Sequence, residues 1–381
     1  MNCRDVVVIG AGITGLSAAW ELSRAGRDVV LIERADEVGG VIRSQRVPRV
    51  GVIDLGPQTV RSKDPALFQH LEDLGIADDR IVAGENGKAR YIVWDGELVE
   101  LPHSPGAFIA SGLLSSRAKL RLLAEPFRGT RKGEDESVRK FFKRRLGKEV
   151  AERLVDPFVA GVYAGDPRQL SMEAVFPELK AGVDRSGSIV RWGLSRMRGG
   201  KGDRSKRAAE LFSFPEGLAH WPRTIAEKLG EDRVWLGHKT VSARRIDDVW
   251  EIRTKVDGEV RTVHAKQVVL AVPANRVSKI LKDARRSSTH ALKDISYSPV
   301  ATVHLAYRRE SVTHPLDGFG YLCPSAAGRK VLGVLWISSL FPARVEDDRV
   351  LLTTFIGGAR DPQRAYESEG HLIDIAYREH R

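Results

Sequence analysis

Three glycines near the N-terminus have the spacing of a phosphate-binding loop. The segment is Gly10-Ala11-Gly12-Ile13-Thr14-Gly15, directly after an apolar run. In such a loop the first glycine allows a tight turn, the second lets a pyrophosphate approach the backbone, and the third lets a helix pack closely on a strand. The N–H groups that open the following helix are donors for phosphate oxygens. This spacing predicts binding of a dinucleotide.

The elements around these glycines are those that a dinucleotide site requires. Val6–Ile9 is a continuous apolar run, as expected of a parallel strand buried on both faces. Apolar residues then recur at helical spacing from Leu16 until Gly26, which ends the helix. Val29–Ile32 is a second strand, and Glu33 follows it, where it can accept hydrogen bonds from ribose hydroxyls. Because Glu33 is acidic, the 2′-phosphate of NADP is disfavoured.

A second glycine pair decides between FAD and NAD. The stretch after the second strand contains Arg34, Gly39, Gly40, Ile42 and Arg43. It resembles the diglycine motif of the amine oxidase and phytoene desaturase superfamily of flavoproteins. In that superfamily a bare backbone passes close to the cofactor, and an arginine reaches towards its phosphates. The resemblance implies FAD as the cofactor.

The composition is that of an ordinary globular protein. The chain has 381 residues, 42% of them hydrophobic and 29% charged, which is enough for two or three domains. Its two cysteines, Cys3 and Cys323, form no closely spaced pair, which favours a reducing compartment. There is no signal peptide and no run of about 18 apolar residues, so a membrane-spanning helix is not expected.

The net charge of +11 is concentrated in two stretches. Residues 117–145 contain eleven Lys and Arg against four Asp and Glu, and residues 191–207 contain seven against Asp203 alone. A basic surface this local favours an anionic partner such as acidic lipid, a polycarboxylate substrate or nucleic acid. A solvated face in an Arg-rich protein is the plainer alternative. No DNA-reading motif is present, so nucleic acid is not expected as a partner.

Motifs of conventional catalysis are missing from the sequence. There is no HExxH, no CxxC pair and no GxSxG segment, so neither a metal site nor a catalytic side chain is expected. A flavin oxidase needs neither, because the isoalloxazine ring takes the hydride itself and the protein supplies position and electrostatics.

The order of the remaining elements predicts an α/β fold with three parts. Two are a Rossmann-type two-dinucleotide-binding FAD domain (residues 1–86 and 234–297) and a mixed-sheet substrate domain (87–105, 212–233 and 298–381). Between them lies a helical insert (106–211). The insert shows helical apolar spacing, whereas Val234–Val272 reads as a series of strands that returns to the Rossmann sheet. Three later strands, Val300–Tyr307, Val331–Ile337 and Val350–Ile356, predict a second sheet.

Four further motifs resemble those of the protoporphyrinogen oxidase family. They are Asp156–Pro167, Phe212–Leu218, Gly318–Pro324 and Leu332–Trp336. The likeness is collinear from Asp5 to at least Gly358, so it covers almost the whole chain.

The resemblance implies which residues hold FAD. They are Gly10, Ala11, Gly12, Ile13, Thr14, Gly15, Glu33, Arg34, Gly39, Gly40, Ile42, Arg43 and the loop Gly56-Pro57-Gln58-Thr59, with Val241 beside the adenine through its backbone.

It also implies a substrate site. Arg90 stands where the family's arginine pairs with a substrate propionate, and Gly161 offers its carbonyl to pyrrole N–H groups. The residues that clamp the macrocycle are Phe319, Gly320, Leu322, Leu335 and Phe355. On sequence alone, Arg90 reads as a surface arginine and the apolar residues as core, so both interpretations stay open.

The implied chemistry is the six-electron oxidation of protoporphyrinogen IX to protoporphyrin IX, with dioxygen as acceptor. The helical insert corresponds to the family's membrane-associating region, which implies a cytoplasmic protein bound peripherally to an anionic surface at the inner face of the cell membrane. A ferrochelatase contact and a homodimer are the macromolecular partners left open.

Several alternatives remain at this point. Coproporphyrinogen III is a rival substrate, and another amine-oxidase-like activity is a more distant one. The family's chains continue beyond the position where this chain stops. We therefore expect that the chain is a truncated fragment with weakened flavin binding. An inactive fragment is a further alternative.

Overall fold

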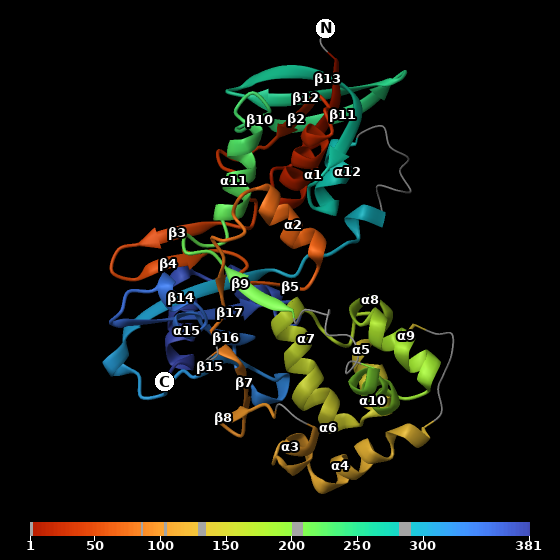
Figure 1. The fold of residues 1–381 in the computed structure, drawn as a ribbon, viewed down its shortest axis with the longest axis vertical. Helices are drawn as coiled ribbons and strands as arrows, with labels where there is room; N and C mark the ends of the chain where they lie inside the picture. The colour runs from red at the N-terminus through yellow and green to blue at the C-terminus, as the bar shows by residue number, and fades with distance from the viewer. Residues whose placement is uncertain (1–2, 85–86, 103–104, 129–134, 200–208, 282–290) are drawn as a thin grey trace. The chain divides into compact units, whose positions relative to one another are not determined.

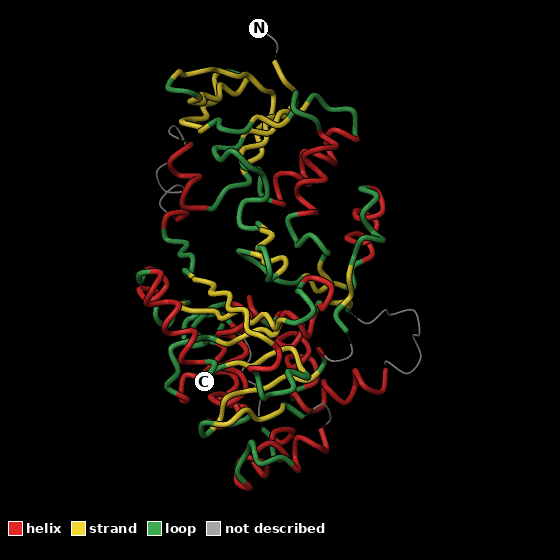
Figure 2. Tube along the Cα trace, turned by 90° about the vertical axis from the view of Figure 1, so that its left-hand side faces the viewer, coloured by secondary structure: helices red, strands yellow, loops and turns green. Residues whose placement is uncertain are grey.

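The computed structural model divides into two compact units (Figure 1). Unit 1 comprises Met1–Val82 and Ala209–Tyr297, and unit 2 comprises Ala83–Ala208 and Ser298–Arg381. The chain begins in unit 1 and ends in unit 2, as the marked termini show in both views (Figures 1 and 2). The structure describes residues 3–84, 87–102, 105–128, 135–199, 209–281 and 291–381.

Unit 1 is built on a six-stranded sheet with the order β10-β2-β1-β13-β12-β11. Strands β10, β2, β1 and β13 are parallel neighbours, whereas β13, β12 and β11 form an antiparallel meander. The strands are β1 (Cys3–Ile9), β2 (Val29–Ile32), β10 (Val234–Trp235), β11 (Lys239–Ile246), β12 (Val249–Val256) and β13 (Glu259–Leu270). The expected return of a late strand series to the Rossmann sheet is observed, because β13 pairs with β1 along most of the latter's length.

The core of unit 1 explains why the second half of β1, Val6–Ile9, is apolar at every position. Val6 and Val8 belong to one hydrophobic cluster, and Val7 belongs to another. Successive side chains of a strand point to opposite faces, so a strand covered on both faces needs apolar residues throughout. Leu16 and Ala19 of helix α1 (Ile13–Arg24) complete the first cluster.

The remaining helices and strands of unit 1 lie outside this six-stranded sheet. The helices are α2 (Pro65–Asp73), α11 (His220–Leu229) and α12 (Ala274–Ile280). The small strands are β3 (Ser44–Val47), β4 (Gly51–Asp54), β5 (Val60–Ser62), β6 (Ile81–Val82) and β9 (Glu210–Ser213), of which β3 pairs with β4 and β9 pairs with β5 and β6.

The expected domain boundaries differ from the two units by a few residues near Ala83 and Ala209, and by a whole segment at residues 212–233. We expected residues 212–233 in the substrate domain, but the structure places them in unit 1. Trp221 and Ile225 of α11 share the hydrophobic cluster that contains Leu16 and Ala19 of α1. The helical apolar pattern of this segment therefore serves the Rossmann core, which sequence order alone does not indicate.

Unit 2 contains a second six-stranded sheet with the order β14-β17-β16-β15-β7-β8. All neighbours are antiparallel except β15 and β7, so the sheet is mixed as expected. The strands are β7 (Ala89–Trp94), β8 (Glu97–Glu100), β14 (Val300–Arg308), β15 (Gly318–Leu322), β16 (Gly333–Trp336) and β17 (Arg349–Gly357). Helices α14 (Ile337–Leu340) and α15 (Glu369–Glu379) follow β16 and β17.

The helical insert of unit 2 has a hydrophobic core of its own, which includes Val138, Phe141, Val159 and Met172. Figure 1 shows α5, α8, α9 and α10 gathered beside α7. Its helices are α3 (Pro105–Ala110), α4 (Ser116–Leu123), α5 (Val138–Arg145), α6 (Lys148–Val150), α7 (Asp156–Tyr163), α8 (Met172–Val175), α9 (Pro177–Ser186) and α10 (Ile189–Gly199). Among the residues that the structure describes, no helix is long and apolar enough to cross a bilayer.

Candidate functional site

The glycine-rich loop has the backbone that a phosphate cradle requires. Gly10 has a φ of 106°, a conformation that side chains disfavour. A Cβ atom on Gly15 would overlap the carbonyl oxygen of Gly10, so this position needs glycine for internal packing. A Cβ atom on Gly12 would meet nothing within 4 Å. Packing within the protein therefore gives no reason for a glycine at position 12, and close approach of a bound group does.

The first turn of α1 follows Gly12 directly in the chain. Gly12 is the N-cap and has no side chain to satisfy the backbone N–H groups of the first turn. These groups have no carbonyl partner within the helix, and the turn contains no acidic side chain. Such a helix start is suited to a phosphate, both by its donors and by the positive end of its dipole.

The diglycine pair packs onto the same loop. Gly39 donates its N–H to the carbonyl oxygen of Ala11 at 2.8 Å and forms a parallel bridge with Gly12. A Cβ atom on Gly40 would lie 3.2 Å from the Cα of Gly12. The two glycine motifs, distant in sequence, thus form one cradle, and side chains there would close it.

Glu33 lies at the edge of this cradle. Its carboxylate accepts hydrogen bonds from the N–H of Ala11 at 2.8 Å and from the N–H of Ala35 at 2.9 Å. The N–H of His238 donates to the carbonyl oxygen of Glu33 at 2.7 Å, which brings the start of β11 beside the acid. The carboxylate is therefore fixed at the carboxyl end of β2, where the ribose of a dinucleotide would lie.

Val241 lies in an irregular part of β11. The pairing of β11 with β12 shifts register between Thr240 and Ser242, so Val241 is left out of the regular ladder. A bulged residue keeps backbone groups that the ladder does not use. This geometry fits the expected contact of the Val241 backbone with adenine.

The remaining expected FAD residues lie in the same unit, with different exposures. A Cβ atom on Gly56 would overlap the carbonyl oxygen of Val41, so this loop passes close to the diglycine segment. Arg34, Arg43 and Pro57 are exposed, whereas Ile42 and Thr59 are half-buried. Arg43 forms an ion pair with Glu37. Gln58 is buried, and its amide donates to the carbonyl oxygens of Asp54 and Gly56 at 2.6 and 2.8 Å. Its side chain therefore braces the loop from within.

Sequence reasoning missed a polar junction that supports this cradle. The buried carboxylate of Asp54 accepts hydrogen bonds from the Ser44 hydroxyl and from the N–H of Leu218. Ser44 in turn accepts from the N–H of Ala219 at 2.9 Å. Gly217 has a φ of 84°, and a Cβ there would collide with both Ser44 and Asp54. The glycine of the Phe212–Leu218 motif was the available signal.

In unit 2, a bulge brings two expected substrate residues to one face of the sheet. Phe319 and Leu322 are three positions apart on β15, so a regular strand would point them to opposite faces. The pairing of β15 with β7 shifts register within this stretch, and Gly320 has a φ of 131°. Leu322 is paired with Ile92, so the two side chains point to the same face of the sheet. Arg90 is two residues before Ile92 on β7 and therefore points to this face as well. The Arg90 guanidinium carbon lies 5.1 Å from the centre of the Phe319 ring, which places Phe319 on this face too.

The cross-strand register extends this face to β16 and β17. Leu322 is opposite Gly333, and Gly333 is opposite Phe355. Leu335 is opposite Gly320. Residues directly opposite each other share a face of the sheet. The other face carries the unit's hydrophobic core, which includes Tyr321, Val334, Trp336, Leu352 and Ile356.

Helix α7 meets the first of these faces at Gly161. A Cβ atom there would overlap the Leu322 side chain, so glycine is needed for the contact. Gly161 lies in the last turn of α7, where backbone carbonyls have no partner within the helix. Its carbonyl is therefore chemically suited to accept an external N–H. The structure thus gathers Arg90, Gly161, Phe319, Gly320, Leu322, Leu335 and Phe355 on one face of the sheet.

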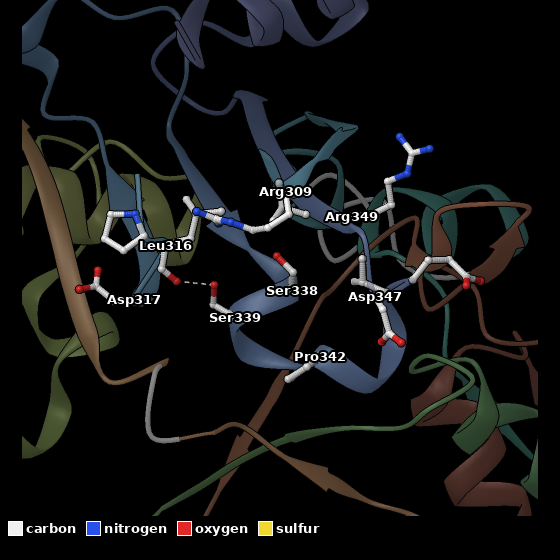
Figure 3. A pocket seen from close by; sticks show the side chains of 12 residues that line it. Arg309, Leu316, Asp317, Ser338, Ser339, Pro342, Asp347 and Arg349 are labelled. Atoms are coloured by element: carbon white, nitrogen blue, oxygen red, sulfur yellow. Dashed lines mark hydrogen bonds between the residues drawn. The ribbon is translucent and has the colours of Figure 1, made fainter. Parts of the chain in front are cut away.

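A pocket elsewhere in unit 2 does not coincide with this face. It has a volume of about 410 Å³ and lies beside the turn where the Ser339 hydroxyl donates to the carbonyl oxygen of Leu316 (Figure 3). Its charged lining is mixed, with Asp317, Glu346 and Asp347 against Arg309 and Arg349. None of the expected substrate residues lines it, so we do not assign the substrate there.

The comparison with protein families decides the class of this protein. The family model for flavin containing amine oxidoreductases matches residues 13–380. The chain belongs to this family. A flavin amine oxidoreductase of this fold takes its cofactor as FAD, and the glycine cradle, the α1 N-terminus and Glu33 fit that dinucleotide.

Two relatives of this chain carry the name protoporphyrinogen oxidase. Protoporphyrinogen oxidase 2, chloroplastic/mitochondrial, of Arabidopsis thaliana is 34% identical over 98% of this chain and 78% of that protein. Protoporphyrinogen oxidase of Homo sapiens is 32% identical over 93% of this chain and 78% of its own length. The resemblance that the four motifs indicated is confirmed.

Solved structures support the fold. The match to the structure of a candidate protoporphyrinogen oxidase from Exiguobacterium sp. 255-15 covers 100% of this chain and 83% of the other chain, with a TM-score of 0.83 and 22% identity. Putrescine oxidase bound to putrescine covers 94% of this chain and 76% of its own, with a TM-score of 0.67 and 22% identity. The expected α/β class and the FAD cofactor are confirmed, whereas the roles of individual residues stay predictions.

Proposed function

We propose that this chain oxidises protoporphyrinogen IX to protoporphyrin IX, with FAD as cofactor and dioxygen as acceptor. The observation that carries the proposal is the match over 98% of the chain to a protein named protoporphyrinogen oxidase 2. The substrate face of unit 2 supports it, because apolar side chains beside one arginine suit a flat macrocycle with carboxylate arms.

The residues of unit 1 bind and orient the cofactor. The N–H groups that open α1 would donate to the pyrophosphate, Glu33 would accept hydrogen bonds from the ribose, and the backbone of Val241, at the irregularity of β11, would contact adenine. When bound, the flavin supplies the acceptor for hydride from a meso carbon of the porphyrinogen. The chain's own contribution to the chemistry is then position and the exclusion of water.

The residues of unit 2 bind and orient the substrate. Arg90 pairs with a propionate and is held over the Phe319 ring. Leu322, Leu335 and Phe355 offer apolar contact to the macrocycle. The carbonyl of Gly161, in the last turn of α7, accepts pyrrole N–H groups, which fixes the rotation of the macrocycle.

Porphyrin fluorescence tests the proposal. The purified chain is supplied with FAD and given protoporphyrinogen IX, coproporphyrinogen III or a primary amine in separate reactions. We expect the highest kcat/KM for protoporphyrinogen IX and no oxidation of the amine. A higher kcat/KM for coproporphyrinogen III would overturn the choice of substrate, and oxidation of the amine alone would overturn the porphyrinogen class.

We further propose that this is a cytoplasmic protein that docks peripherally on the anionic inner face of the cell membrane through α4 and the turn after it. Leu120, Leu123 and Phe127 are 68%, 58% and 86% exposed, and their spacing places them on one side of this segment. Arg117 and Arg128, also exposed, flank this apolar stripe. An apolar stripe flanked by cations suits the interface of an anionic bilayer.

Flotation with liposomes tests the docking surface. We expect binding to vesicles containing anionic lipid, weaker binding at high salt, and loss of binding in the double variant Leu120→Ser/Phe127→Ser. Val260→Ser, which removes an exposed apolar side chain from unit 1, is the matched control. Equal binding of the double variant and the control variant would show that this surface is not the one that docks.

A further inference from the structure

Asp156 is the first residue of α7, the helix that carries Gly161. Its carboxylate accepts hydrogen bonds from the N–H of Ser325 at 2.8 Å and from the Ser325 hydroxyl at 2.9 and 3.0 Å. It also accepts from the Arg360 guanidinium at 2.9 Å, and Arg360 contacts the Ser325 hydroxyl as well. One carboxylate thus satisfies donors from two other segments of unit 2.

Those two segments follow the strands of the substrate face. Ser325 comes three residues after Leu322, and Arg360 comes five residues after Phe355. Strands β15 and β17 are both antiparallel to β16, so they run in the same direction and end at the same edge of the sheet. Asp156 therefore ties the beginning of α7 to the ends of both strands.

The far end of α7 is tied to the same edge. Ala164, which caps the helix, has a left-handed φ of 49° and accepts a hydrogen bond on its carbonyl oxygen from the N–H of Ala359 at 2.7 Å. Gly161 lies between the two tethers and contacts Leu322. The backbone carbonyl of Gly161 consequently has its position set by bonds at both ends of the helix.

The Asp156–Arg360 pair is shielded from solvent. The side chains of Arg360 and Asp156 are 19% and 14% exposed. Removing one partner of such a pair leaves the other charge without compensation, which is more costly than losing an exposed ion pair.

We propose that Asp156 is a positioning residue for the substrate site, acting through α7 to hold the Gly161 carbonyl against the sheet face, with Arg360 as its partner. The inference rests on the proposed function for its substrate, and it adds two polar residues that do not touch the macrocycle. A porphyrin N–H contact exists before and during hydride transfer, so its loosening raises KM and the dissociation constant of porphyrin more than it lowers kcat.

The experiment compares the full chain with the variants Asp156→Asn, Arg360→Lys and, as control, Asp184→Asn. Asp184 forms an ion pair with Lys180, and both partners lie on the same helix, α9. We expect Asp156→Asn to raise KM and the porphyrin dissociation constant about ten-fold with kcat within about two-fold. Arg360→Lys keeps the positive charge but has an ammonium group in place of the forked guanidinium. We therefore expect a smaller rise in KM and in the porphyrin dissociation constant. FAD content, a property of unit 1, stays unchanged.

Hydrogen exchange of the α7 amides provides a readout that does not depend on turnover. Faster exchange at residues 158–163 in Asp156→Asn, and not in Asp184→Asn, supports the tether even if the chain oxidises no porphyrinogen. Unchanged exchange, KM and porphyrin affinity in an active Asp156→Asn protein overturn the inference. If Asp156→Asn does not fold, the same comparisons in Arg360→Lys decide between these outcomes.

Discussion

The guanidinium carbon of Arg90 lies 5.1 Å from the centre of the Phe319 ring, although the two residues are on different strands and Phe319 would point away in a regular strand. The contact depends on the bulge at Gly320, whose φ of 131° a side chain would oppose. The positively charged guanidinium of Arg90 therefore lies against the apolar surface that we propose binds the macrocycle.

We expect Arg90→Ala to raise the porphyrinogen KM about ten- to a hundred-fold and to lower kcat much less. A propionate is distant from the reacting meso carbon, so its ion pair is similar in the ground and transition states. Steady-state kinetics measures both constants. Arg308→Ala, which removes an exposed arginine from the same unit, should leave KM unchanged. Equal KM values for Arg90→Ala and the wild type would disprove the assignment.

Substitutions at Gly12 and Gly15 should have different effects, the first on FAD affinity and the second on the stability of the fold. We expect Gly12→Ala to keep the thermal midpoint within about 2 °C and to weaken FAD binding at least about ten-fold, because the new methyl group enters only the space for the cofactor. Gly15→Ala must displace the Gly10 carbonyl and should lower the free energy of unfolding even without FAD. Titration with FAD and thermal unfolding of the flavin-free protein test the pair. Full FAD affinity in Gly12→Ala would contradict the site.

The Rossmann part of the fold could be predicted from sequence because its determinants are local. The apolar run Val6–Ile9, the glycine spacing and Glu33 occur within one short segment, and each has a single structural meaning. Helix α11 was assigned to the wrong domain because the sequence pattern of an amphipathic helix indicates that one face is buried but does not indicate which element covers that face. Its partner, α1, lies about 200 residues earlier in the chain.

His304 should make stability depend on pH. Burial, with a smaller contribution from Arg344, lowers its pKa from 6.5 to about 4. Between these values the unfolded chain binds more protons than the folded one, so stability falls as the pH falls from about 6.5 to about 4 and is retained above that window. The slope from this residue is at most about 1.4 kcal/mol per pH unit.

Thermal unfolding of His304→Gln across this pH range tests the prediction. The variant lacks the titrating group, so its midpoint should fall less steeply with decreasing pH than that of the wild type. His380, whose pKa burial also lowers to about 4, contributes in the same direction and remains in both proteins. His371→Gln, which removes a half-exposed histidine, is the control. Parallel curves for wild type and His304→Gln would contradict the assignment.

Glu125 holds the insert together through a buried network. It accepts hydrogen bonds from Arg145, from the Ser188 hydroxyl and from the N–H groups of Ile189 and Val190 at the start of α10. We expect Glu125→Gln to cost about 3 kcal/mol in the free energy of unfolding, because Arg145 remains buried without its counter-charge.

Denaturant unfolding measures this cost, with Glu178→Gln as the matched control. Glu178 pairs with Arg196 on the surface, where an ion pair contributes less than about 1 kcal/mol. FAD affinity should be the same in both variants, because these residues belong to unit 2. Equal losses of stability would show that burial of the Glu125 pair does not matter.

The substrate face could be predicted only through resemblance. Arg90, Leu335 and Phe355 have no spacing that marks them as a site, since they come from three strands far apart in sequence. Their convergence depends on the register of β7, β16 and β17 and on the bulge in β15. Asp156, although it opens the Asp156–Pro167 motif, and Arg360 were not predicted as site residues for the same reason, because nothing in their spacing indicates that they contact each other.

The central claim is that porphyrinogen donates its electrons to a flavin bound by this chain. The most direct test mixes the full chain, loaded with FAD, with protoporphyrinogen IX in the absence of oxygen and follows the flavin absorbance in a stopped-flow instrument. We predict loss of the oxidised-flavin band in a phase whose amplitude matches the bound FAD, and recovery of the band with porphyrin formation when oxygen is admitted. A flavin band that protoporphyrinogen leaves unchanged, in protein shown to hold FAD, would contradict the account.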